Sequence, residues 1–299
     1  MPRFSKLGYV ALDVSDPARA RRHYEELVGL SVSGTGDGGE LFLRCSDDHH
    51  NLVLHPASRP GLRRIGWEME SEQELENAVK AVSDSGLAVR ELEPGACDAL
   101  HQGPTFRFFE PHTGATIELY AVMRNLGGKP YEPTVAKIQR LGHVVVATPA
   151  FDAAFDFFTK VLDFKLSDAV GNAFALMRCF PNPYHHSFGL ARADRRALHH
   201  VNFMVSEIDD VGRGMWRFQR NEVPLIYGPG RHPASGSVFL YFLDPDGLGN
   251  EYSYGMEQFP EENPRRPRVL EPAPESADSW GAPPPRFNLV ETTARDEGV

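Results

Sequence analysis

The chain has 299 residues, a formal net charge of −10, and a composition that is 41% hydrophobic and 24% charged. This length suffices for about two domains, and the composition is ordinary for a soluble globular protein. The acidic balance argues against nucleic acid or an anionic membrane as the main partner, because both require basic patches.

Targeting and cysteine signals point to the cytoplasm. No apolar run approaches the ~20 residues of a membrane span, and the first residues, MPRFSKLGYVALDV, lack the apolar core of a secretory signal. Cys45, Cys97 and Cys179 are an odd number of cysteines, lie far apart and form no CxxC pair. We therefore expect reduced thiols and a cytoplasmic protein.

An internal repeat organises the sequence. KLGYVALDV, which begins at Lys6, resembles RLGHVVVAT, which begins at Arg140, and Leu7 matches Leu141 at an offset of 134. Each segment is typical of an apolar strand, a polar turn, an amphipathic helix and another strand. In the second segment a helical face is indicated by apolar residues at three- and four-residue steps: Phe151, Phe155, Phe158 and Leu162.

Each half also contains a weaker second copy. RRIGWEMESEQELENAV begins at Arg63 and LHHVNFMVSEIDDV begins at Leu198, and both again indicate a strand followed by a helix. The sequence therefore predicts an α+β fold of four βαβββ modules, which form two domains. Each domain should be a curved mixed sheet with flanking helices, because one module alone cannot bury its apolar face.

Composition shifts suggest where the domains end. We expect an N-terminal domain over residues 1–125, a linker over 126–138, a second domain over 139–256 and a proline-rich tail over 257–299. The tail holds eight of the 24 prolines, so most of it should be extended or mobile. Three aromatic side chains could fix it to the body: Phe259, Trp280 and Phe287.

The two halves differ at three positions of the repeat. His143 corresponds to Tyr9, and Glu251 corresponds to Glu118 after a one-residue gap. His200 corresponds to Arg64, with a register that the sequence leaves open by one residue. A single histidine in a strand is usually a core residue. Here the second half offers two imidazoles and a carboxylate at equivalent places, the facial ligand set used for non-haem Fe(II).

Five motifs in order carry a family resemblance: LGHVVVATP, YHHSFGLA, LHHVNFMV, GPGRHPASGSVFLYFLDPDG and NEYSYG. Together they resemble the type I extradiol ring-cleaving dioxygenases of the vicinal oxygen chelate superfamily, such as the 2,3-dihydroxybiphenyl and catechol 2,3-dioxygenases. The resemblance covers roughly residues 5 to 256 and excludes the tail.

The resemblance implies a role for each matching residue. It assigns the iron ligands to His143, His200 and Glu251 and the acid–base function to His186. It assigns the support of oxygen and substrate to His232 and Tyr241. The implied cofactor is Fe(II), although Mn(II) accepts the same ligands. The implied reaction is cleavage of a catechol with O2 to a muconic semialdehyde-type product in aromatic catabolism, by a homo-oligomer.

The substrate is less closely defined. Apolar candidates for the pocket, which could equally be ordinary core, are Phe174, Met177, Phe188 and Phe203. The acidic balance and this apolar neighbourhood favour a hydrophobically substituted catechol. A carboxylated substrate stays open, because three arginines could bind it: Arg178, Arg192 and Arg265.

Two other functions stay open on the same scaffold. One is a metal-dependent lyase or isomerase, which would typically use four protein ligands. The other is a non-catalytic protein that binds an aromatic compound and would not need the three ligands together. We expect the pair His49-His50, in the polar stretch CSDDHHN, to be exposed to solvent, and His185 and His199 to be structural.

Overall fold

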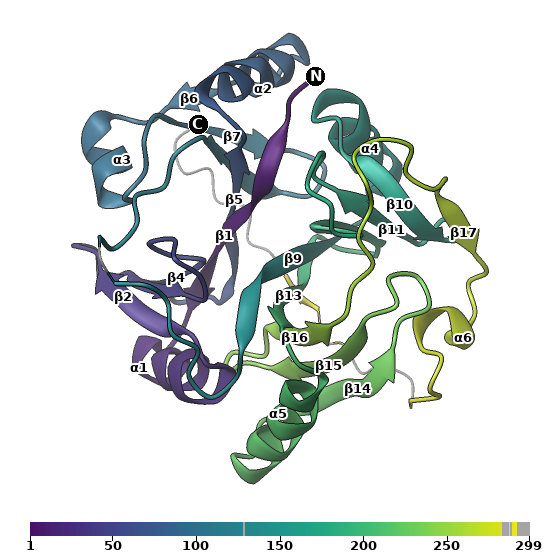
Figure 1. Cartoon of the computed structure of the whole chain (residues 1–299). Coiled ribbons are helices and arrows are strands. Elements are labelled where there is room, and N and C mark those ends of the chain that lie inside the picture. The colour runs from purple at the N-terminus through teal and green to yellow at the C-terminus, as the bar shows by residue number, and fades with distance from the viewer. Residues whose placement is uncertain (128, 283–286, 288, 292–299) are drawn as a thin grey trace.

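The computed structural model describes residues 1–127, 129–282, 287 and 289–291, which form two mixed β-sheets with helices on their outer faces (Figure 1). The first sheet has the strand order β2-β3-β4-β1-β5-β8-β7-β6, and the second, apart from two strands added by the C-terminal segment, β10-β11-β12-β9-β13-β16-β15-β14. These orders correspond strand for strand. The predicted α+β fold of four βαβββ modules is therefore confirmed.

The first half contains two of the modules. The first comprises β1 (Phe4–Val14), α1 (Pro17–Arg22), the π-helical turn η1 (His23–Val28), β2 (Ser31–Thr35), β3 (Leu41–Arg44) and β4 (Leu52–Pro56). The second comprises β5 (Gly61–Met69), α2 (Glu72–Asp84), β6 (Arg90–Glu91), the additional helix α3 (Pro94–Ala99), β7 (Thr105–Glu110) and β8 (Ala115–Tyr120).

The second half repeats this order. Its first module comprises β9 (Ile138–Thr148), α4 (Phe151–Asp156), the π-helical turn η2 (Phe157–Val161), β10 (Lys165–Val170), β11 (Phe174–Arg178) and β12 (Phe188–Arg192). Its second comprises β13 (Ala197–Val205), α5 (Ile208–Arg220), β14 (Leu225–Arg231), β15 (Val238–Leu243) and β16 (Gly249–Tyr254). The domain boundaries that we draw in the sequence stay a prediction.

Local chemistry explains how the helices begin and which face they bury. Asp16 caps α1 by accepting a hydrogen bond from the Arg19 amide, and Ser71 caps α2 in the same way at Glu74. On α5 the buried side includes Val211 and Phe218, seven residues apart, so this helix packs one face on the sheet. None of the described helices combines the length and apolar character that a membrane crossing requires.

The tail is more ordered than its proline content predicts. β17 (Arg268–Leu270) pairs with β10, β18 (Val290–Glu291) pairs with β13, and α6 (Pro274–Ala277) lies between them along the chain. Phe259 is buried, whereas Trp280 is 52% exposed and lies beside Arg231. Figure 1 shows this segment in yellow along the outer side of the second half. Residues 283–286, 288 and 292–299 of the tail lie outside the described part.

Aromatic rings from both halves meet at their junction. The Trp67 ring of the first half lies 5.0 Å from the Phe164 ring and 6.2 Å from the Phe188 ring of the second half. Phe4 also contacts Phe164, at a ring separation of 5.1 Å. Because all four side chains are fully buried, this junction is part of the hydrophobic core rather than a solvated interface.

Replacing Trp67 with alanine should lower the free energy of unfolding by about 3–5 kcal/mol, because it empties the centre of this junction. The matched control is Trp216→Ala on α5, where the side chain is 61% exposed. That change should stay within about 0.5 kcal/mol. Urea unfolding followed by far-ultraviolet circular dichroism measures both, and equal losses would contradict the packing described.

Candidate metal centre

Three buried side chains from adjacent strands of the second sheet lie close together. His143 comes from β9, His200 from β13 and Glu251 from β16. The two imidazole Nε2 atoms lie 2.9 Å apart, and Glu251 Oε2 lies 2.9 Å from that of His143 and 3.3 Å from that of His200. All three residues are buried. The positions singled out by the repeat are therefore brought together within one cluster.

Strand register and one amide hold the carboxylate in position. Glu251 pairs with Asn202 across β16 and β13, two residues beyond His200. The Asn202 Nδ2 atom donates to Glu251 Oε2 at 2.8 Å and to Ser253 Oγ at 2.9 Å. A Cβ on Gly142 would lie 2.0 Å from the Asn202 side-chain oxygen, so only glycine fits beside this amide. The sequence analysis missed Asn202.

The centre holds a buried carboxylate beside the imidazole of His143. Burial lowers the pKa of His143 to about 4, so its imidazole is neutral at pH 7. Burial would raise the pKa of Glu251, but hydrogen bonds from His143, His200 and His232 outweigh it and hold that pKa well below its usual range. A buried carboxylate without a formal positive partner is costly. The cluster therefore favours a bound cation.

The spacing of the ligand atoms fits a metal ion. Nitrogen and oxygen ligands lie ~2.1 Å from a divalent transition metal, so two of them at right angles are ~3.0 Å apart. The three separations in this cluster lie between 2.9 and 3.3 Å. Two imidazoles and one carboxylate on one side leave the other side of the ion open. His143, His200 and Glu251 could therefore hold a catalytic metal.

Strand register settles how the first half aligns with this centre. Arg64 pairs with Ala11 across β5 and β1, and His200 pairs with Val145 across β13 and β9. Ala11 and Val145 are separated by the repeat offset, since 145 − 11 = 134. Arg64 is therefore the structural counterpart of His200, which resolves the one-residue ambiguity in the sequence.

The first half neutralises its own carboxylate with arginine. Glu118 Oε1 accepts a hydrogen bond of 2.5 Å from the Tyr9 hydroxyl. Its other oxygen accepts from Arg107 Nε and Nη2 at 2.9 and 2.8 Å. Arg64 lies 3.8 Å from the same carboxylate. Glu118 thus has guanidinium partners where Glu251 has imidazoles. The cluster of candidate metal ligands therefore belongs to the second half.

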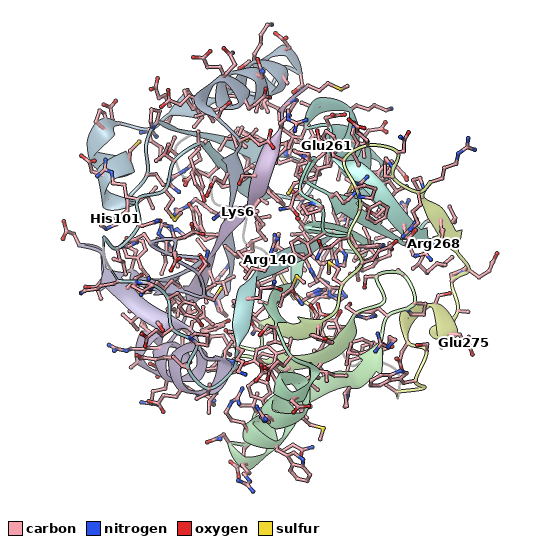
Figure 2. All side chains as sticks on the ribbon, viewed as in Figure 1. Lys6, His101, Arg140, Glu261, Arg268 and Glu275 are labelled. Carbon is pink, nitrogen blue, oxygen red and sulfur yellow. The ribbon has the colours of Figure 1, made fainter. Side chains whose placement is uncertain are left out.

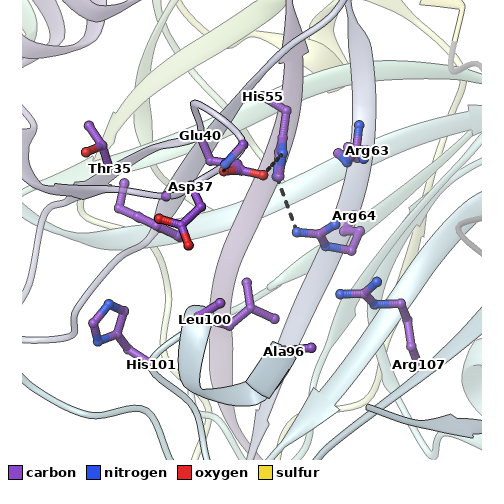
Figure 3. A pocket seen from close by; sticks show the side chains of 14 residues that line it. Thr35, Asp37, Glu40, His55, Arg63, Arg64, Ala96, Leu100, His101 and Arg107 are labelled. Atoms are coloured by element: carbon purple, nitrogen blue, oxygen red, sulfur yellow. Dashed lines mark hydrogen bonds and ion pairs between the residues drawn. The ribbon is translucent and has the colours of Figure 1, made fainter. Parts of the chain in front are cut away.

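A cavity of about 800 Å³ opens beside this arginine cluster. Figure 3 shows Arg63, Arg64 and Arg107 along one of its sides and His101 on another, with His55 between Glu40 and Arg64. Its lining mixes cationic and anionic groups, and its arginines Arg63 and Arg107 pair with the buried carboxylates of Asp13 and Glu118. This cavity lies over the first sheet, away from the cluster of His143, His200 and Glu251.

The other predicted site residues surround the cluster. The His186 ring lies 4.1 Å from the His143 ring, measured between centroids. His232 Nδ1 donates to the Ala277 carbonyl at 2.7 Å, because a carbonyl only accepts. His232 Nε2 lies 3.0 Å from the Tyr241 hydroxyl and 3.5 Å from Glu251 Oε1. The chain thus brings all six predicted residues into one region.

His199 contacts the neighbouring candidate ligand His200. Its Nδ1 lies 2.7 Å from His200 Nδ1. If His200 binds a metal through Nε2, its Nδ1–H must donate to His199, an arrangement that commonly orients metal-bound histidines. Phe287 of the tail packs against the rings of His199 and Tyr241, at 4.1 and 5.2 Å. His199 would therefore act structurally, as predicted, by orienting the ring of His200.

One sequence prediction is corrected here. His49 and His50 are buried, not exposed, because their loop folds inward under Phe42. They are the counterpart of His185-His186. His49-His50 lie just before β4, which is hydrogen-bonded to β1, and His185-His186 lie just before the equivalent strand β12, which is hydrogen-bonded to β9. For three of the four pocket candidates the structure favours the alternative that the sequence left open, because they belong to the main hydrophobic core: Met177, Phe188 and Phe203.

Fold and cluster together define a class: a protein of duplicated βαβββ modules with a buried cluster able to bind a metal ion. The model of the Glyoxalase/Bleomycin resistance protein/Dioxygenase superfamily matches residues 6–119 and 140–252. The chain belongs to this superfamily.

Several known proteins are similar over most of their length. An iron-dependent extradiol dioxygenase from Rhodococcus jostii (strain RHA1) is 28% identical over 86% of this chain and 91% of its own. A biphenyl-2,3-diol 1,2-dioxygenase from Paraburkholderia xenovorans (strain LB400) is 28% identical over 83% and 87%.

Solved structures agree on the fold. BphC, a halotolerant catechol dioxygenase, has a TM-score of 0.85 at 22% identity and covers 93% of this chain and 94% of its own. The Mn(II)-bound glyoxalase from Novosphingobium aromaticivorans has a TM-score of 0.84 at 26% identity and covers 98% and 99%.

The two equivalent glutamates should respond differently to the same substitution. Glu251→Gln removes the charge that a metal requires, so we expect the purified variant to retain no metal after dialysis. Glu118→Gln should retain it, yet lose roughly 3–5 kcal/mol of unfolding free energy because its buried guanidinium partners lose their counter-charge. Elemental analysis and urea unfolding measure the two effects. Metal loss in both variants would contradict a single centre.

Proposed function

We propose that the chain is a non-haem Fe(II)-dependent extradiol dioxygenase, which cleaves the ring of a catechol with O2 to a muconic semialdehyde-type product in aromatic catabolism. The observation that carries this proposal is the convergence of His143, His200 and Glu251 in a buried cluster, with His186 against it. Relatives that match more than four-fifths of the chain are extradiol dioxygenases, which supports the same reaction.

His143, His200 and Glu251 are the proposed ligands. Bound Fe(II) would supply a Lewis acid that lowers the pKa of catechol hydroxyls and would bring the ring and O2 into contact. Mn(II) accepts the same ligands, so our assignment of Fe(II) rests on the named iron-dependent relative.

His186 is the proposed acid–base residue. Burial lowers the pKa of His186 well below its ordinary value, so the ring is neutral before the substrate binds. A neutral ring can accept a proton from a catechol hydroxyl and later return it to an oxygen of the product. His232 and Tyr241, joined by a hydrogen bond of 3.0 Å, would orient the oxygen and the substrate.

The surroundings favour a hydrophobically substituted catechol. The three arginines that could bind a carboxylate have other partners. Arg178 stacks on Phe259 at 4.3 Å, and Arg192 and Arg265 form ion pairs of 2.7 and 2.9 Å with aspartates. Tyr227, Phe239 and Tyr241 form an aromatic cluster beside the proposed ligands, which suits an apolar substituent.

A metal-dependent lyase or isomerase is the second candidate. It is favoured by the Mn(II)-bound glyoxalase of Novosphingobium aromaticivorans, which covers 98% of this chain. Such an enzyme would rearrange its substrate without consuming oxygen. The proposed dioxygenase requires O2 in equal amount with its catechol.

We further propose a cytoplasmic location and a homo-oligomeric assembly, with a small-molecule catechol and O2 as the substrates. Cys45, Cys97 and Cys179 are buried free thiols, which suits a reducing compartment. The assembly rests on the family resemblance alone, and size-exclusion chromatography with light scattering tests it.

Oxygen uptake separates the two candidate enzymes. The chain is loaded anaerobically with Fe(II), mixed with a panel of neutral and carboxylated catechols, and then exposed to oxygen. We expect one O2 consumed per catechol, a yellow ring-fission product and a preference for apolar substituents. Catechol-independent oxygen use, or turnover of a glyoxalase substrate without oxygen, would reject the dioxygenase.

Replacing His186 with alanine should leave bound metal unchanged and slow turnover by ~10²–10⁴-fold, the usual contribution of a general acid–base group. The matched control is His50→Ala, its counterpart in the first half, which should leave turnover unchanged. Steady-state oxygen uptake and iron content measure both. Normal turnover in the His186 variant would remove its proposed role.

A further inference from the structure

His186 is the first of three buried polar side chains that contact one another in series, as a chain. His186 Nδ1 lies 3.0 Å from His185 Nδ1, and His185 Nε2 lies 2.9 Å from Asp168 Oδ2. Asp168 and His185 are fully buried, and His186 is 5% exposed. The chain leads away from the metal cluster to β10 and the C-terminal segment.

The far end of this chain is an anion. Arg265 donates to both oxygens of Asp168, at 2.9 and 3.0 Å, and Arg268 donates from its side chain at 3.1 and 2.6 Å. The Arg268 backbone amide donates a further bond of 2.9 Å. Burial raises the pKa of Asp168, but the bonds from His185 and the two arginines outweigh it and hold the pKa well below its usual range. Asp168 is therefore a carboxylate that can only accept hydrogen bonds.

This carboxylate fixes the position of each proton in the chain. Because Asp168 only accepts, His185 must carry its hydrogen on Nε2. Burial lowers the pKa of His185, so its ring is neutral and its Nδ1 is a bare acceptor. The facing His186 Nδ1 must then carry a hydrogen and donate it. The remaining nitrogen of His186, Nε2, is left with its lone pair available as a base.

The first half supplies an internal comparison. His49 and His50 repeat the same contact, with their Nδ1 atoms 3.1 Å apart. The counterpart of Asp168 is Gly34, since Gly34 pairs with Phe42 as Asp168 pairs with Leu176, at the repeat offset of 134. A Cβ built on Gly34 would lie 3.8 Å from His49 Nε2. The histidine pair thus occurs in both halves. The aspartate accompanies it only in the second half, which also contains the candidate metal ligands.

Arginines neutralise a second group of side chains that could hold a metal ion. Asp168, His185 and Glu257 lie close enough to hold an ion. Arg265, however, bridges the two carboxylates, with Nη2–oxygen separations of 3.0 Å to Asp168 and 2.7 Å to Glu257. Arg268, which Figure 2 marks at the outer side of the molecule, supplies a second guanidinium to Asp168. Guanidinium groups thus supply the positive charge that an ion would bring.

We propose that Asp168 and His185 are positioning residues that hold His186 in the tautomer with a hydrogen on Nδ1 and a basic Nε2. The inference rests on the proposed function for the step that this tautomer serves. In that step the proton of a catechol hydroxyl moves to His186 Nε2, and the same proton later returns to a product oxygen. His185 and Asp168 exchange no proton and keep the ring oriented throughout.

A matched pair of substitutions at His185 separates positioning from packing. Glutamine can accept from His186 through its oxygen and donate to Asp168 through its nitrogen, whereas leucine fills a similar volume without either group. We expect His185→Leu to lower kcat by ~10- to 100-fold, the usual cost of losing an orienting partner, with KM and iron content unchanged. His185→Gln should recover most of that loss. Equal kcat values, or a better leucine variant, would overturn the proposal.

Asp168→Asn tests the other end of the chain. An asparagine can present its amide to His185 and reverse every hydrogen bond, so kcat should again fall by ~10- to 100-fold while iron stays bound. Asp152→Asn, which alters an exposed ion pair with Arg192, is the control and should leave kcat unchanged. A thermal melt checks that each variant is folded.

Ring-nitrogen NMR of the full-length protein tests the tautomer without any turnover. In metal-free protein with 15N-labelled histidine, His186 should carry its hydrogen on Nδ1, and Asp168→Asn should shift it toward Nε2. A wild-type His186 with hydrogen on Nε2 would overturn the inference. If His186 carries its hydrogen on Nδ1 but the protein cleaves no catechol, the positioning role is supported and the proposed function is rejected.

Discussion

A buried glutamate in each half is the constraint on which the rest of the structure depends. Glu118 and Glu251 lie at equivalent places on β8 and β16, and both are fully excluded from solvent. A carboxylate removed from water needs positive charge or several donors close by. The first half meets this need with Arg64, Arg107 and the Tyr9 hydroxyl. The second half offers imidazoles, and a metal ion would complete its charge.

The duplicated fold allows this difference because it fixes positions without fixing side chains. Equivalent strands carry Tyr9 or His143, Arg64 or His200, and Arg107 or Tyr241, all around a glutamate. Large arginine side chains close one centre with ion pairs, whereas shorter imidazoles leave room for an ion. The same backbone therefore yields a self-neutralised core in one half and a buried cluster of candidate metal ligands in the other.

Much of this arrangement could be predicted from sequence, because a repeat of 134 residues makes equivalent positions visible without coordinates. The α+β modules and the candidates His143, His200 and Glu251 followed from it. Asp168 could not be found in this way, since its contact with His185 joins strand β10 to a loop 17 residues away. The burial of His49 and His50 was missed because their polar neighbours suggested solvent. The same repeat that aligned the ligands would have aligned this pair with His185-His186.

The C-terminal segment completes the proposed site from outside the repeats. The Ala277 carbonyl sets the tautomer of His232, and Arg268 bonds Asp168 behind His186. A chain cut after β16 would contain every candidate ligand but neither of those two supports. Truncation at that point would therefore separate the residues that could hold a metal from the contacts that orient the proton-handling histidines.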